Sequence, residues 1–202
     1  MYMDDFTLYG DDFEPALQTL EKVLQRCIAT RLCLSHEKCH MMMTEELILG
    51  HYISTTGIQV DPAKIQIILL IPTPSTQTKV RNFLGFSRYY RRFIKNFSQI
   101  STPLYALTGN TDFIWTDKCD SAFEDLKRLI STTLVLRGPN WDLPFQISSN
   151  ASDTAIGAVL GREEDKKPHA IYYISENISP TELNYTVTEK EFLAVIYAVN
   201  KF

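Results

Sequence analysis

The sequence lacks a long apolar run, a secretion signal and any clear disulfide framework. No stretch approaches the ~20 apolar residues that cross a bilayer, and Met1 to Asp5 has neither the basic start nor the apolar core of a signal peptide. We therefore expect an intracellular protein with no membrane partner. A hydrophobic content of 45% and a charged content of 22% indicate a folded chain and argue against disorder.

The cysteines are few and irregularly spaced. A chain of 202 residues can bury a core without disulfides. The four cysteines are Cys27, Cys33, Cys39 and Cys119. One group has zinc-ligand chemistry, and it consists of Cys33, His36, Cys39 and His40. The alternative interpretation is the start of a strand with a buried cysteine thiol. We prefer this alternative because no second pair of ligands follows at the spacing of a zinc site.

Acidic residues are missing from the middle of the chain. Residues 62–111 contain no acidic and seven basic residues, whereas residues 1–61 carry a balance of −6 and residues 112–202 a balance of −5. The net charge of −4 hides this asymmetry. A basic segment between acidic flanks favours a polyanionic partner, although a solvated helix face would also account for it.

Periodicity predicts an α+β chain. We expect a hairpin over residues 2–9, then a helix after Asp12 with an apolar face. Short strands are predicted over residues 32–43 and 47–54, with a turn at 55–57. Asp61-Pro62 predicts a helix that ends before Pro72. The apolar face of the first helix consists of Leu17, Leu20, Leu24, Cys27 and Ile28.

The remaining elements are helices followed by a sheet. We expect helices over residues 76–90, from Thr102-Pro103, and from a cap at Asp117. Three strands are predicted over residues 144–149, 154–160 and 170–175, and a last helix from about Thr188 to Phe202. The predicted inward-facing residues are Val80, Phe83, Leu84 and Ser87 in the 76–90 helix and Ala122, Phe123, Leu126 and Leu129 in the helix after Asp117.

Adjacent carboxylates at a hairpin tip are the first sign of chemistry. Asp4 and Asp5 repel each other, so burying them is costly unless a divalent cation lies between them. In two-metal phosphoryl transfer, carboxylates hold ions ~4 Å apart that activate the attacking oxygen and stabilise the leaving one. Most Asp-Asp pairs are solvated turns, but the apolar flanks of Tyr2-Met3-Asp4-Asp5 favour the metal interpretation.

This motif resembles the signature of reverse transcriptases, and the blocks after it resemble the polymerase polyprotein of gypsy-class long-terminal-repeat retrotransposons. The resemblance covers nearly the whole chain. The blocks are Glu37-Lys38-Cys39-His40, Leu49-Gly50-His51-Tyr52-Ile53-Ser54, Gly57-Ile58, Asp61-Pro62, Lys64, Val80-Arg81-Asn82-Phe83-Leu84-Gly85, Tyr89-Tyr90-Arg91-Arg92-Phe93-Ile94, Pro103-Leu104, Ala151-Ser152-Asp153, Ala155-Ile156-Gly157-Ala158-Val159-Leu160, Asn184-Tyr185 and Glu189-Lys190-Glu191.

The resemblance implies the C-terminal part of a reverse-transcriptase palm (1–60), a thumb with connection helices (61–113) and a truncated ribonuclease-H-like antiparallel sheet with one helix (114–202). It assigns metal binding to Asp4 and Asp5, and to Lys38 the protonation of pyrophosphate, for which a solvated lysine is the alternative. Leu49-Gly50-His51 would hold the primer end, or be a plain strand with a glycine bend. In the thumb, cations alternate with aromatics, which suits a surface that follows a nucleic-acid backbone. Those cations are Lys79, Arg81, Arg88, Arg91, Arg92 and Lys95.

The ribonuclease H pattern departs from the family at one position. Asn150 stands where the resemblance implies the first metal-binding aspartate, and asparagine offers one carbonyl oxygen and no charge. The second carboxylate matches Glu191, which also fits a capping box with Thr188. Asp153 lies three residues further on, at the turn, where it is expected to serve as a cap.

Three interpretations follow. The first is a retrotransposon RNA-directed DNA polymerase and ribonuclease H segment, cut at both ends, that needs Mg2+ or Mn2+, acts on RNA–DNA hybrid or duplex and is inactive as an isolated chain. The resemblance places such a protein in a cytoplasmic particle or the nucleus. The second is a retained nucleic-acid-binding module without catalysis. The third is an unrelated metal-binding protein.

Overall fold

The computed structural model describes residues 6–10, 12–109, 112–132, 135–164 and 166–202. The chain divides into two compact units, Met1–Thr44 and Glu45–Phe202. Asp4 and Asp5, together with the first strand of the predicted hairpin, lie outside the described residues. Within the described part of the chain, every helix is too short or too polar to span a bilayer.

The first unit contains α1 (Phe13–Thr30) and the 3-10 turn η1 (His36–Lys38). The helix begins directly after Asp12, as predicted, but of its expected apolar face only Cys27 is buried. The strands predicted over residues 6–9 and 32–43 are wrong, because neither segment is in a strand. An extended segment needs a neighbouring strand for its backbone groups, and the described residues of this unit offer none.

The second unit opens with a three-stranded antiparallel sheet. Its strands are β1 (Glu46–Ile48), β2 (His51–Ser54) and β3 (Gly57–Val60), in the order β1-β2-β3. The single strand predicted over residues 47–54 is therefore two strands. Leu49 and Gly50 have φ angles of 47° and 69°, and this left-handed pair reverses the chain between β1 and β2.

Helices α2 (Pro62–Leu70) and α3 (Gln77–Tyr89) confirm their predicted positions. The carboxylate of Asp61 accepts the N–H of Ala63 at 2.8 Å, and the hydroxyl of Thr76 accepts the N–H of Lys79 at 3.3 Å. These two caps satisfy N–H groups that have no partner within the helix. Local side-chain chemistry thus explains why both starts could be predicted.

Helix α4 (Phe97–Ala106) begins five residues before the predicted start at Thr102. Asn96, with a φ of 57°, reverses the chain after the 3-10 turn η2 (Arg91–Phe93). Pro103 therefore lies inside the helix, where proline removes one backbone hydrogen bond. The apolar contacts of Phe97 and Leu104 with the core compensate for this local cost.

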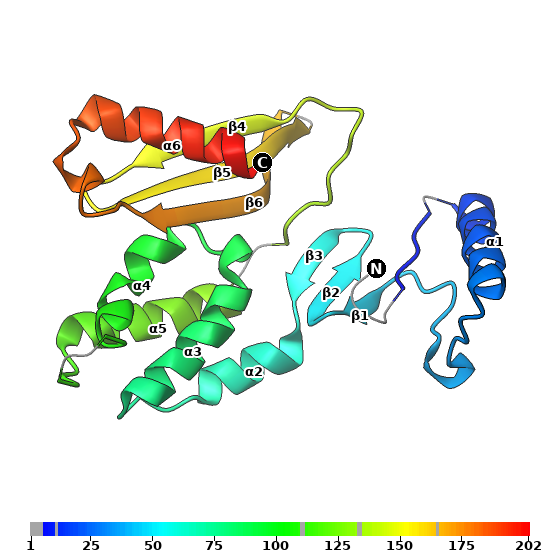
Figure 1. Cartoon of the computed structure of the whole chain (residues 1–202), viewed down its shortest axis with the longest axis horizontal. Coiled ribbons are helices and arrows are strands. Elements are labelled where there is room, and N and C mark those ends of the chain that lie inside the picture. Colours follow the sequence, from blue (N-terminus) through cyan, green and yellow to red (C-terminus); the bar gives the residue numbers. More distant parts are fainter. Residues whose placement is uncertain (1–5, 11, 110–111, 133–134, 165) are drawn as a thin grey trace. The chain divides into compact units, whose positions relative to one another are not determined.

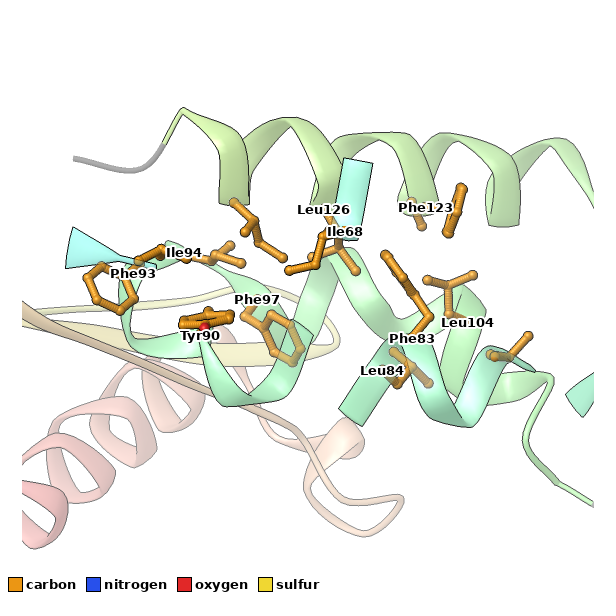
Figure 2. Close-up of a cluster of buried hydrophobic side chains, with 14 of the residues drawn as sticks. Ile68, Phe83, Leu84, Tyr90, Phe93, Ile94, Phe97, Leu104, Phe123 and Leu126 are labelled. Carbon is orange, nitrogen blue, oxygen red and sulfur yellow. The ribbon is translucent and has the colours of Figure 1, made fainter. Parts of the chain in front are cut away.

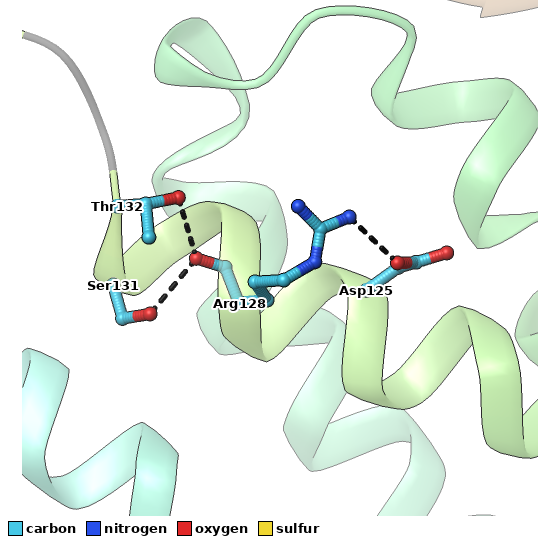
Figure 3. A network of polar contacts seen from close by, with 4 residues as sticks. All are labelled: Asp125, Arg128, Ser131 and Thr132. Carbon is cyan, nitrogen blue, oxygen red and sulfur yellow. Dashed lines mark hydrogen bonds and ion pairs between the residues drawn. The ribbon is translucent and has the colours of Figure 1, made fainter.

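Helix α5 (Asp117–Ser131) is preceded by Thr116 as its cap residue, one position before the predicted Asp117. At its other end, the carbonyl of Arg128 accepts hydrogen bonds from the hydroxyls of Ser131 and Thr132, each at 2.8 Å (Figure 3). The guanidinium of Arg128 pairs with Asp125 at 2.8 Å in the same network. The backbone N–H of Thr132 also donates to this carbonyl, at 2.9 Å, so backbone and side chains together close the end of the helix.

The main core lies among helices α2 to α5 (Figure 2). Phe83 and Phe123 meet at its centre with ring centroids 4.5 Å apart. The predicted inward residues of α3 are all buried, and so are those of α5 except Leu129, which is partly buried. Helices α3 and α5 therefore bury the apolar faces that their sequence period predicted. The labelled core residues are Ile68, Phe83, Leu84, Tyr90, Phe93, Ile94, Phe97, Leu104, Phe123 and Leu126.

The C-terminal part is a second antiparallel sheet with one long helix. Its strands are β4 (Gln146–Ala151), β5 (Ala155–Glu164) and β6 (Lys167–Asn177), in the order β4-β5-β6. After the 3-10 turn η3 (Glu182–Asn184), helix α6 (Val187–Lys201) lies across one face of this sheet (Figure 1). All three strands and the last helix confirm the prediction, although β5 and β6 are longer than expected.

Hydrogen bonds connect both sheets of the second unit to α4 and to the segment that follows α5. On β6, the Ser175 hydroxyl accepts the N–H of Ser98 in α4 at 2.9 Å. The segment after α5 forms a bridge in which Leu136 exchanges both backbone hydrogen bonds with Ile58 of β3. The next residue, Arg137, donates its N–H to the Ala170 carbonyl on β6 at 3.2 Å.

Candidate nucleic-acid interface

The turn between β1 and β2 is fixed by side chains from the end of α3. The hydroxyl of Tyr89 donates to the carbonyl of Leu49, and the hydroxyl of Tyr90 donates to the carbonyl of Gly50 at 3.1 Å. Nδ1 of His51 also lies 2.9 Å from the Leu49 carbonyl oxygen. The three residues predicted to hold a primer end thus form one turn, bound to a helix 40 residues later in the sequence.

His51 lies in an aromatic enclosure. Its ring stacks on Phe93 at a centroid distance of 5.8 Å and meets Tyr89 at 5.1 Å and Tyr90 at 5.7 Å. Because a carbonyl only accepts, Nδ1 must carry the proton, which leaves Nε2 as an acceptor in the neutral ring. Nε2 is buried without a hydrogen-bond partner among the described residues. Burial lowers the pKa of His51 below its ordinary value of 6.5, despite the hydrogen bond to Leu49.

This lowered pKa makes stability depend on pH. The unfolded chain gains a proton on His51 near pH 6.5, whereas the folded chain gains it only at lower pH. The contribution of His51 to the free energy of unfolding is therefore complete above pH 6.5 and is lost as the pH falls below that value. We expect the thermal midpoint of the wild type to fall between about pH 7.5 and pH 5.5 by more than that of His51→Gln. The exposed His36→Gln is the matched control and should keep the wild-type profile. Equal pH dependence of wild type and His51→Gln would contradict this assignment.

The predicted cations fall into two groups, and the first makes contacts within the protein. Arg81 donates to the Thr108 carbonyl at 2.8 Å, and Lys79 donates to the Ser75 hydroxyl at 3.0 Å. The Arg92 guanidinium lies 5.2 Å from the ring centroid of Tyr172 on β6. These side chains stabilise the fold as well as adding positive charge.

The second group is exposed to solvent. Arg88, at the end of α3, and Lys95, after η2, make no hydrogen bond or ion pair with any part of the chain that the structure describes. Arg91 does not belong to this exposed group, because it is half-buried and lies near Tyr197, whose pKa is raised by burial despite this nearby positive charge. Arg88 and Lys95 are thus the two members of the predicted set whose charges are directed wholly to solvent.

Asn150 is the penultimate residue of β4, close to the predicted strand end. It pairs with Gly157 on β5, which pairs with Ser175 on β6, so these residues form one row across the sheet. Because Ser175 contacts α4, the row faces α4. Asn150 accordingly lines a shallow hollow with Asn96 and Gln99.

The prediction that Asn150 faces the helix carrying Glu191 is wrong. Ala151, the next residue, packs against Ile156 and Ala194 on the α6 side. Successive side chains of a strand point to opposite faces, so Asn150 must point away from α6. The pattern of residues predicts the strand, but it does not indicate which of the two faces of the strand each helix covers.

Glu191 nevertheless reaches the end of β4. One of its carboxylate oxygens, Oε1, accepts the N–H of Ala151 at 3.3 Å. The capping box predicted for Thr188 and Glu191 is wrong, because Thr186 and Glu189 form it two residues earlier. In that box, the Glu189 carboxylate accepts the N–H of Thr186 at 2.8 Å. The Glu191 carboxylate thus contacts the backbone of β4 at Ala151, whereas the Asn150 side chain points to the opposite face of the sheet.

The described residues do not fit a divalent-metal centre. Within the described ranges, no three side chains of His, Cys, Asp or Glu converge as a metal-binding group, and this holds for Cys33, His36, Cys39 and His40. At the end of β4, the Asn150 amide adds no charge to the Glu191 carboxylate. Two hydrated cations need several carboxylates. Lys38 is exposed at the end of η1.

Sequence reasoning missed the hydroxyls of Tyr89 and Tyr90 as partners of the turn. The alternation of cations and aromatics in the thumb predicts a nucleic-acid-binding surface, but it predicts no role for these hydroxyls. The available signal was the choice of tyrosine over phenylalanine at a buried position, because a buried hydroxyl needs an acceptor. Tyr90 is 2% exposed and meets that requirement at the Gly50 carbonyl.

Comparison with known proteins identifies the class to which this fold belongs. Residues 115–202 match the RNase H-like domain found in reverse transcriptase. The chain is similar to solved structures of a foamy viral protease-reverse transcriptase, one in complex with RNA/DNA hybrid and one with double-stranded DNA. The first gives a TM-score of 0.79 at 24% identity over 96% of this chain and 26% of that one, and the second 0.76 at 26% over 92% and 39%.

Curated relatives narrow the class to one family. The chain is 35% identical over 203 residues to the retrovirus-related Pol polyprotein from transposon 412 of Drosophila melanogaster, covering 100% of this chain and 16% of that protein. It is 30% identical over 214 residues to the Pol polyprotein from transposon gypsy of the same organism, covering 100% and 20%. The chain belongs to the Pol polyproteins of gypsy-class long-terminal-repeat retrotransposons and corresponds to their reverse-transcriptase and ribonuclease-H-like region. It spans about a fifth of the length of the relatives it matches.

Proposed function

We propose that residues 45–113 are the end of a polymerase palm and a thumb, which hold the sugar–phosphate backbone of an RNA–DNA hybrid or duplex during reverse transcription. The observation that carries this proposal is the basic segment 62–111, which has seven cations and no acidic residue. It folds into α2, α3, η2 and α4, and its helix α3 is bound to the Leu49-Gly50 turn. Foamy viral relatives in complex with hybrid and with double-stranded DNA support the same partner.

The chemistry of the site favours backbone binding without sequence recognition. Arg88 and Lys95 are exposed cations on either side of η2. Such side chains neutralise phosphates and release counterions, which makes binding steeply dependent on salt. The exposed rings of Phe86 and Tyr89 accompany them on the last two turns of α3. Exposed aromatics beside cations suit contact with sugars and unpaired bases.

The ribonuclease-H-like part is proposed to contribute binding more than cleavage. We assign Asn150 to the place of the first metal-binding aspartate and Glu191 to the second carboxylate, as the family pattern implies. Asn150 carries no charge, and this favours a second candidate function, a nucleic-acid-binding module without catalysis. The family implies Mg2+ or Mn2+ for polymerase chemistry through Asp4 and Asp5.

Removing exposed cations should weaken binding and its salt dependence together. We expect the double variant Arg88→Ala and Lys95→Ala to flatten the slope of log K against log salt by about one to two units. The measurement is fluorescence anisotropy of a labelled RNA–DNA hybrid over a salt series. Arg128→Ala is the matched control, since Arg128 is an exposed cation on α5 that already pairs with Asp125. Binding that ignores salt, or a slope that the double variant leaves unchanged, would count against the proposed function.

A further inference from the structure

We infer that Tyr89 and Tyr90 are positioning residues, whose hydroxyls lock the Leu49-Gly50 turn to the end of α3. The turn and the cations beyond it then present one surface of fixed geometry to a nucleic-acid backbone. This inference deepens the proposed function and rests on it for the identity of the ligand. The two hydrogen bonds from Tyr89 and Tyr90 to the turn, which we call the latch, are present in the chain without any ligand.

The geometry of the latch is specific. Two consecutive tyrosines donate to two consecutive carbonyls, Tyr89 to Leu49 and Tyr90 to Gly50. His51 adds a further hydrogen bond to the Leu49 carbonyl, within the turn itself. Both carbonyls of the turn are therefore occupied by side chains. Since the backbone of the turn is not in a strand ladder, these side-chain bonds fix where it lies.

The turn needs such support because its backbone is strained. Leu49 has a φ of 47°, and a left-handed conformation is unfavourable for a residue with a side chain. Gly50 has a φ of 69°, which glycine adopts without that cost. A backbone conformation of this kind persists where contacts with the surrounding residues hold it in place. The hydrogen bonds from Tyr89 and Tyr90 are such contacts.

The two tyrosines differ in burial. Tyr90 is 2% exposed and Tyr89 is 50% exposed, so the bond from Tyr90 is shielded from competing water and the bond from Tyr89 is not. Burial, followed by the nearby Asp61 carboxylate, raises the pKa of Tyr90 to about 12. Tyr90 consequently keeps its proton and remains a donor throughout the physiological range.

The latch joins elements that the chain separates. The turn precedes β2, whereas Tyr90 is followed directly by η2 with its arginines. Arg88 and Lys95 flank the tyrosines in sequence at a distance of a few residues. Any displacement of the turn relative to α3 would therefore change the spacing between the turn and the cations. A backbone ligand that contacts both would bind less tightly when this spacing varies.

The test uses the full chain with Tyr90→Phe and Tyr89→Phe, each of which removes one hydroxyl and keeps the ring. In the free chain, hydrogen exchange of the amides at residues 49–51 should become about threefold to tenfold faster in Tyr90→Phe, with a smaller effect in Tyr89→Phe. Tyr105→Phe is the matched control, a tyrosine on α4 whose loss should leave the turn unchanged. Unchanged exchange at the turn in both variants would overturn the inference.

Binding supplies the second readout. An RNA–DNA hybrid with a recessed primer end should bind Tyr90→Phe about threefold to tenfold more weakly than wild type, with the salt slope unchanged because no cation is lost. A flattened slope, or full affinity despite a loosened turn, would count against a positioning role. If wild type binds no hybrid at any salt concentration, the proposed function fails, while the exchange result still decides whether the latch exists.

Discussion

Replacing Asn150 with aspartate is expected to raise ribonuclease H activity by a thousandfold or more once the rest of the metal site is supplied. The family pattern puts the first metal-binding aspartate at Asn150, which is neutral here, and the Glu191 carboxylate reaches the end of the same strand at the Ala151 N–H. A carboxylate would add a full negative charge where two divalent cations meet in this family. A thousandfold change in rate corresponds to about 4 kcal/mol of transition-state stabilisation.

The experiment places residues 115–202 in the corresponding position of an active ribonuclease H of the same class. This chimera should leave an RNA–DNA hybrid uncut in Mg2+, and Asn150→Asp in the same chimera should cleave it. Asn184→Asp is the matched control, because it makes the same chemical change at an exposed residue of η3. Cleavage at a normal rate with Asn150 in place would show that the first metal ligand lies elsewhere.

Gly57→Ala is expected to lower the free energy of unfolding by about 2–4 kcal/mol. Gly57 has a φ of 135°, and a Cβ there would lie 2.2 Å from the Leu136 carbonyl oxygen and 2.9 Å from Cγ1 of Val135. That carbonyl accepts the N–H of Ile58 at 2.8 Å. The added methyl group would therefore force β3 away from the bridge to Leu136, as well as straining the backbone.

Gly85→Ala provides the matched control. Gly85 is exposed in the middle of α3, and a Cβ there would meet nothing within 4 Å. Alanine should stabilise that helix by about 0.5–1 kcal/mol because glycine loses more backbone entropy on folding. Urea denaturation of both variants measures the difference. Similar stabilities for the two variants would mean that the bridge to Leu136 contributes little to the fold.

Several features could be predicted because their causes are local. Asp61 and Thr76 cap α2 and α3 from positions that the sequence shows directly. The buried face of α3 follows from a period of 3.6 residues, and the family follows from ordered blocks along the whole chain. The basic segment between acidic flanks was visible as a count of charges. None of these needs knowledge of which distant residues meet.

Other features could not be predicted because long-range contacts determine them. Residues 32–43 have the composition of a strand, but no neighbouring strand pairs with them among the described residues. The face of the sheet that α4 covers is shown by the contact between Ser98 and Ser175, which are 77 residues apart. The division of the cations into structural and exposed groups likewise depends on Tyr172 and Thr108. Propensity reports only local preference, so these outcomes required the packed structure.

The sequence by itself determined the family and the order of the elements from Asp61 onward, but its periodicity predicted a strand through the turn at Leu49-Gly50. Only the tertiary structure decided what holds that turn, because Tyr90 and Gly50 are 40 residues apart. It also decided that His51 is buried, which lowers its pKa, and that Asn150 points to α4. Hydrogen bonds and burial depend on the distance between groups in space, and the chain reveals that distance only where neighbours in sequence are also neighbours in the fold.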